Sequence, residues 1–153
     1  MKRISLLVMA FMVMFSCSAF AETNEWEHVT TTKLESVYFS NQKLNFDMEG
    51  NIDFDERSVL SEAGVKDFLD HCSKSERSKY KNVSYIEKFR TLNGNKVKTN
   101  LLMIYDKNDK MIEISNAERP WDTLVFGTID YSTACKVAQY VQSHFDEVMK
   151  RTK

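Results

Sequence analysis

The 153-residue sequence contains few of the residues that interrupt a chain, with one proline and four glycines. A single proline, Pro120, leaves no proline-rich linker between two domains, and so few glycines leave no glycine-rich phosphate loop. Excess charge of one sign is also absent, because 21 basic residues balance 22 acidic ones. Such a chain has no general attraction for polyanions, so we expect no nucleic-acid partner.

Catalytic and metal motifs are missing too. The sequence has no G-x-S-x-G nucleophile elbow, and its carboxylates are scattered along the predicted strands. His71 and Cys72 are adjacent on a predicted helix, which does not bring their side chains together, and one such pair cannot supply the four ligands of structural zinc. We therefore expect a protein that is not an enzyme and uses no cofactor.

Met1 to Ala21 is a predicted signal peptide. A basic start, Lys2-Arg3, precedes an apolar run, and small residues then form an A-x-A cleavage site. The apolar run spans about a dozen residues, fewer than the roughly 20 that cross a bilayer as a helix. We expect cleavage before Glu22 and export of residues 22–153, as one domain, to the periplasm or the medium.

A lipid anchor at Cys17 is the alternative reading of the same segment. The residues before it, Met14-Phe15-Ser16, loosely resemble a bacterial lipobox. Phe15 is bulky where lipoboxes have small residues, which favours simple cleavage.

Aromatic and β-branched residues, often alternating with polar ones, predict an antiparallel sheet. The predicted strands are Trp26–Val29, Ser36–Phe39, Leu44–Met48, Ile52–Phe54, Tyr85–Leu92, Val97–Tyr105 and Met111–Ile114. Glu49-Gly50-Asn51 and Asn93-Gly94-Asn95 have the composition of tight hairpin turns.

Two helices are predicted from apolar residues three and four positions apart. The first runs from Glu62 to Ser73 behind the N-cap residue Ser61, and a polar loop, Ser73 to Lys81, follows it. The second runs from Ser132 to Met149. The fold class is therefore α+β: an antiparallel sheet of about five to six strands packed by a middle helix and a C-terminal helix.

Several short motifs occur in an order that matches a known family. They are Glu25-Trp26, Ser36–Phe39, Gly50-Asn51, Leu60–Gly64, Ile104–Asp106, Lys110–Ile112 and Pro120–Ile129. In this order they resemble the surface-adhesin protein E-like domain of exported bacterial proteins. The resemblance implies an α+β binding domain, with adhesion to a protein ligand at the cell surface or in the periplasm.

The chain departs from that family at two points. Phe126 precedes Gly127 where similar domains usually have a proline. The family's cysteines correspond to Leu92 and Ala138 here, while Cys72 and Cys135 occur elsewhere in the chain. Export brings both thiols into an oxidising compartment, and each is expected on the buried side of its predicted helix. We therefore expect a disulfide between Cys72 and Cys135.

The segment from Asn45 to Glu56 resembles an EF-hand calcium loop. Its oxygen ligands would be Asn45, Asp47, Glu49, Asn51, Asp53 and a bidentate Glu56. An EF-hand loop lies between two helices, however, and the residues before Asn45 are strand formers. We favour a hairpin with acidic surface residues and keep calcium binding as the alternative function.

Trp26 and Trp121 are the two tryptophans of the chain. They are candidates for an aromatic binding surface, and the competing interpretation places them at the two ends of the sheet core. The function predicted from sequence is thus an exported, non-catalytic binding or interaction module.

Overall fold

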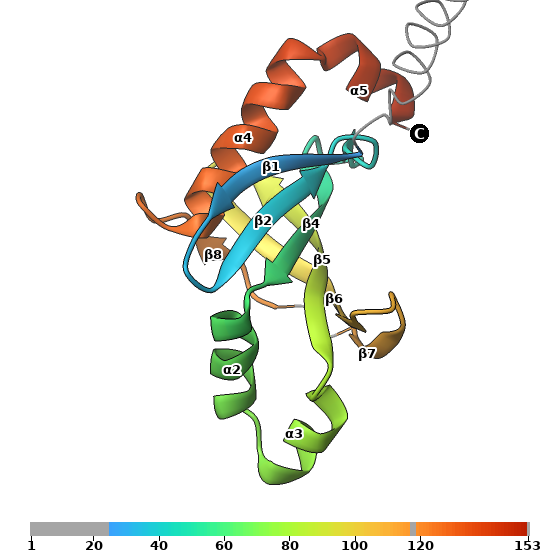
Figure 1. The fold of residues 1–153 in the computed structure, drawn as a ribbon. Coiled ribbons are helices and arrows are strands. Elements are labelled where there is room, and N and C mark those ends of the chain that lie inside the picture. Colours follow the sequence, from blue (N-terminus) through green and yellow to red (C-terminus); the bar gives the residue numbers. More distant parts are fainter. Residues whose placement is uncertain (1–24, 117–118, 153) are drawn as a thin grey trace, which may run out of the picture.

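The computed structural model describes residues 25–116 and 119–152, and Figure 1 shows their arrangement. The predicted signal peptide, its cleavage site before Glu22 and the alternative lipid site at Cys17 lie outside the described residues. Among the described residues, no helix has both the length and the apolar character needed to cross a membrane.

One antiparallel sheet forms the fold, which confirms the predicted α+β class. Across the sheet the strands follow their order in the chain: β1 (Trp26–Thr31), β2 (Glu35–Ser40), β4 (Ile52–Leu60), β5 (Val83–Asn93), β6 (Lys96–Asp106) and β7 (Met111–Ser115). Two short strands lie beside this path, with β3 (Asn45–Phe46) paired to β4 and β8 (Asp122–Thr123) paired to β6. Each predicted strand has a counterpart, although β3 covers only Asn45–Phe46 of the predicted Leu44–Met48, β4 is longer than predicted, and β8 was not predicted.

The described residues also form four helices: α2 (Glu62–Asp70), α3 (Lys74–Tyr80), α4 (Ile129–Ser143) and α5 (Phe145–Arg151). The predicted loop from Ser73 to Lys81 is therefore wrong. Ser73 and Glu76 form a reciprocal capping box that starts α3, and Tyr80 at its end is buried. The cap and one buried aromatic residue thus stabilise α3, although this helix has no apolar stripe.

The prediction of one continuous C-terminal helix is also wrong, because the helix is interrupted at His144. This residue has φ −125° and ψ 31°, outside the helical region. The break lets α5 approach β3, where the rings of Phe46 and Phe145 lie 5.9 Å apart between centroids. Val141 before the break and Val148 after it are both buried in the same core, so the apolar stripe continues across the bend.

Two apolar cores lie on one face of the sheet. The first core, with α4 and α5, contains Phe39, Leu44, Phe54, Leu92, Val97, Ala134, Val137, Val141 and Val148. The second core, with α2 and α3, contains Tyr80, Val83 and Ile104, surrounded by Leu60, Val65, Phe68, Leu69 and Ile86. Phe54 and Leu60 are an even number of residues apart on β4, so their side chains share a face. Figure 1 shows the two helix pairs at opposite ends of the sheet.

A strip of charged residues separates the two cores, and we call it the charged strip: Glu56, Lys88, Arg90 and Asp130. Glu56 is fully buried, with Lys88 Nζ 2.8 Å from one carboxylate oxygen and Arg90 Nη1 2.7 Å from the other. Arg90 also donates to Asp130 Oδ1 at 2.7 Å. Burial alone would raise the pKa of Glu56, but the charges of Lys88 and Arg90 outweigh it and lower that pKa.

Candidate functional site

The residues proposed as calcium ligands form a hairpin rather than a cage. Asp47 accepts hydrogen bonds from the backbone N–H groups of Glu49 at 2.8 Å and Asn51 at 2.9 Å, and from Asn51 Nδ2 at 2.7 Å. Asn45 pairs with Asp53 across β3 and β4. Asp47 is therefore occupied by its own turn, and the bond from the Asn51 side chain is the main cause of its lowered pKa.

Glu56, proposed as the bidentate calcium ligand, points away from that turn into the charged strip. Asp53 instead accepts a hydrogen bond from Thr91 Oγ1 at 2.6 Å. Over residues 25–116 and 119–152, no group of three or more histidine, cysteine, aspartate or glutamate side chains could hold a metal ion.

The predicted disulfide between Cys72 and Cys135 is wrong in this structure, because both thiols are free. Cys72 lies just after α2 beside the second core, and its Sγ donates to the Phe68 carbonyl at 3.3 Å. Cys135 lies on α4, at the opposite end of the sheet (Figure 1). The apolar stripes that suggested a bridge belong to two different cores, which is why they do not bring the thiols together.

Both tryptophans lie outside the two cores, each beside a cation. The guanidinium carbon of Arg57 lies 4.0 Å from the ring centroid of Trp26. Lys98 Nζ lies 5.3 Å from the ring centroid of Trp121, whose exposed fraction is 40%. Neither tryptophan belongs to the residues that form the cores, so the alternative core role gains no support.

Trp26 belongs to the sheet face opposite the helices, which we call the open face. Strand alternation and register place Trp26, Tyr38, Arg57, Val59, Tyr85, Glu87, Phe89, Met103, Tyr105, Met111 and Ile114 on it. These residues come from six neighbouring strands. The open face therefore combines aromatic, apolar and charged side chains, of which Tyr85 and Glu87 are buried.

Arg57 is at the centre of this surface. Its guanidinium lies between the rings of Trp26 and Tyr85, at 4.0 Å and 4.8 Å from their centroids. Its Nε donates to Glu87 Oε1 at 2.9 Å. Tyr85 stacks on Tyr105 with ring centroids 4.7 Å apart. Burial, with a hydrogen bond to Asp109, raises the pKa of Tyr85 to about 12, so its hydroxyl stays protonated at neutral pH.

Apolar side chains on β4 and on the edge strand β7 flank the aromatic group. The exposed fractions are 38% for Val59, 43% for Met111 and 52% for Ile114. Met103 lies between Glu87 and Ile114 in the register, which joins these residues to the aromatic group. Sequence reasoning found Trp26 but missed Arg57 and Glu87, because only the pairing of β4 with β5 brings those two together.

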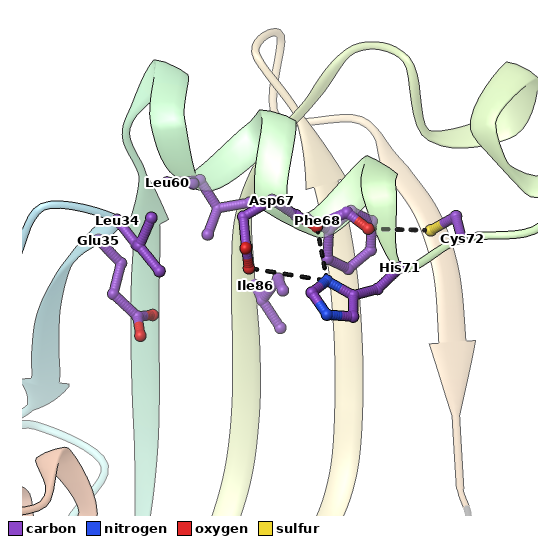
Figure 2. Close-up of a pocket in the computed structure, with 9 residues that line it drawn as sticks. Leu34, Glu35, Leu60, Asp67, Phe68, His71, Cys72 and Ile86 are labelled. Carbon is purple, nitrogen blue, oxygen red and sulfur yellow. Dashed lines mark hydrogen bonds and ion pairs between the residues drawn. The ribbon is translucent and has the colours of Figure 1, made fainter.

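A concave feature lies between α2 and the sheet. This cavity, the α2 pocket, has a volume of about 420 Å³ and an apolar lining of Leu34, Leu60, Phe68 and Ile86. Its polar lining is Glu35, Asp67 and His71. Figure 2 shows Glu35 on one side of the pocket and the His71 ring with Asp67 on the other.

Gly64 lets α2 approach the turn between β1 and β2 at the edge of this pocket. A Cβ atom on Gly64 would lie 2.0 Å from the Leu34 carbonyl oxygen, far inside contact distance. The N-cap residue Ser61 also ties the start of α2 to this turn. Its N–H donates to the Leu34 carbonyl and its Oγ donates to the Lys33 carbonyl, both at 2.8 Å.

Comparisons of the chain with family models, curated proteins and solved structures give no match.

Proposed function

We propose that the chain is an exported, non-catalytic binding module that holds a protein ligand on its open face. The observation that carries this proposal is the combination of Trp26, Tyr105 and Arg57 with exposed apolar neighbours, Val59, Met111 and Ile114. Tryptophan, tyrosine, methionine and arginine are enriched at protein interfaces, and tryptophan, tyrosine and arginine are the residues most often found to dominate the binding energy. The resemblance to adhesin E-like domains supports the same role, with adhesion as its form.

The state of Cys72 supports binding rather than catalysis. Desolvation raises the pKa of this thiol, and its Sγ donates to a backbone carbonyl. A nucleophilic cysteine instead needs a lowered pKa, which stabilises the thiolate. The Glu87 carboxylate is likewise held by Arg57 rather than directed at an open cavity.

Calcium binding through residues 45–56 gains no such support, because the geometry gives these side chains other roles. Asp47 closes a turn and Glu56 neutralises two cations. We therefore propose the open face, and not the hairpin, as the binding site.

The test is a pull-down with immobilised protein that compares two substitutions of similar exposure. Ile114→Lys places a charge on the open face, where the side chain is 52% exposed. Met149→Lys places the same charge on α5, where the side chain is 45% exposed. We expect a ligand retained by the wild type and by Met149→Lys to be lost from Ile114→Lys, because a buried unpaired charge opposes association.

Circular dichroism of both variants separates this result from unfolding. Retention of the ligand by folded Ile114→Lys, or equal loss from both variants, would contradict the assignment of the open face. Retention of no ligand by the wild type from host matrix, serum or periplasmic protein mixtures would contradict the proposed function itself.

A further inference from the structure

We propose that the α2 pocket binds a small hydrophobic cation, with its apolar body under α2 and its positive group at Glu35. This site is separate from the open face, because Glu35 pairs with Leu60 in the register and Leu60 faces the second core. The inference is therefore independent of the proposed protein ligand.

The size and lining of the pocket suit an apolar body. Its volume of about 420 Å³ lies within the usual range for small-molecule sites, which is roughly 300 to 1,000 Å³. Leu34, Leu60, Phe68 and Ile86 come from four separate segments and converge on this space, as Figure 2 shows. An aromatic or branched aliphatic group placed there would cover apolar surface that is now open to water.

The charge of the lining selects the sign of the ligand. Glu35 is half-buried, and its carboxylate makes no hydrogen bond or ion pair with any described residue. A carboxylate without an ion-pair partner beside an apolar pocket attracts a cation. Two negatively charged side chains, Glu35 and Asp67, line the pocket, so an anionic ligand would be repelled.

His71 does not neutralise this charge at Glu35. Its Nδ1 lies 2.8 Å from the Asp67 carbonyl and 3.8 Å from the Asp67 carboxylate, so the ring is held on its own helix. Figure 2 shows the imidazole beside Asp67, with Glu35 across the pocket. Glu35 is thus the carboxylate available to a ligand.

The experiment compares three ligands that share one body: 4-phenylbutylamine, neutral 4-phenylbutanol and anionic 4-phenylbutyrate. Each is titrated into the purified protein, and amide chemical shifts in α2 and β4 report the site. We expect the amine to bind about fivefold more tightly than the alcohol, as for a partly solvated ion pair, and the carboxylate not to bind. Added salt should weaken the binding of the amine and leave the binding of the alcohol unchanged.

Glu35→Gln tests the residue, with Glu62→Gln as a matched control on the exposed first turn of α2. The Glu35 variant should bind amine and alcohol equally, while the Glu62 variant keeps the preference. The proposal is overturned by equal binding of all three ligands to the wild type, by shifts confined to residues outside the pocket, or by a preference that survives Glu35→Gln. Equal loss of amine and alcohol binding in Glu35→Gln would also overturn it, because that pattern indicates a structural role.

Discussion

At the scale of single residues, Gly64 determines how closely α2 meets the sheet. Glycine inside a helix usually costs about 1 kcal/mol relative to alanine, so Gly64→Ala would stabilise α2 if helix propensity decided the outcome. The Leu34 carbonyl, 2.0 Å from the position of the new Cβ, is backbone and cannot rotate away. We expect Gly64→Ala to lower the free energy of unfolding by about 1 to 3 kcal/mol, measured by urea denaturation.

Lys66→Ala is the control for this substitution, because Lys66 is exposed on the same helix and should change stability by less than about 0.5 kcal/mol. Stabilisation by Gly64→Ala would show that α2 can withdraw from Leu34 at no cost.

Glu56 is the residue whose loss should be most costly in the charged strip. Glu56→Gln leaves Lys88 and Arg90 facing a neutral group in a buried setting, since Glu56 itself is 0% exposed. We expect a loss of about 3 kcal/mol in the free energy of unfolding. The pair of exposed Glu147 and half-buried Arg151 provides the comparison, and Glu147→Gln should cost less than about 0.5 kcal/mol.

Acid should destabilise the fold through the same residue. The pKa of Glu56 is lowered in the folded state, so its contribution is complete above the unfolded pKa of about 4.3 and is lost as the pH falls through the folded value. Urea midpoints between pH 7 and pH 3 should therefore fall. The fall should be smaller in Glu56→Gln, and an identical pH profile for both proteins would show that Glu56 does not carry the effect.

At the scale of elements, α3 depends on its cap. Ser73 accepts a hydrogen bond from the Glu76 N–H while the Glu76 carboxylate accepts one from the Ser73 N–H. We expect Ser73→Ala to cost about 1 kcal/mol and to speed hydrogen exchange across residues 74–80. Ser78→Ala, at an exposed position inside α3, is the control, and equal exchange in the two variants would contradict the role of the cap.

The elements that could be predicted from sequence are those with a regular apolar pattern. Alternation identified the strands, and Asn93-Gly94 identified the turn between β5 and β6, where Gly94 has φ 55°. α3 has no apolar stripe, although Ser73 and Glu76 have the spacing of a capping box, a signal that was present and missed. The part of β4 after Phe54 was not predicted, because Glu56 and Ser58 occupy buried positions where an apolar residue was expected.

At the scale of the whole molecule, the site depended on strand register, which a single sequence does not specify. Trp26 was a candidate from its residue type alone, but its contact with Arg57 requires β1, β2 and β4 to pair in order. The error about Cys72 and Cys135 has the same origin. The apolar stripes near the two cysteines were expected to meet, but in the described residues they belong to two separate cores.

The free state of both thiols can be checked directly. We expect alkylation of unfolded, unreduced protein to label Cys72 and Cys135 fully, because their helices cover opposite ends of the sheet. Peptide mapping by mass spectrometry provides the measurement. Detection of a disulfide-linked peptide containing both residues would show that the bond forms and would contradict this arrangement of the helices.

The charged strip has a consequence for how the sequence of this chain can change. Lys88 and Arg90 pair with Glu56 between the two cores, so the apolar side chains of one core do not pack directly against those of the other. Substitutions in α2 and α3 then alter the packing of one end and leave the side chains under α4 undisturbed, as expected for distant, additive sites. The α2 end can therefore acquire a new specificity by mutation while the other end keeps the domain folded.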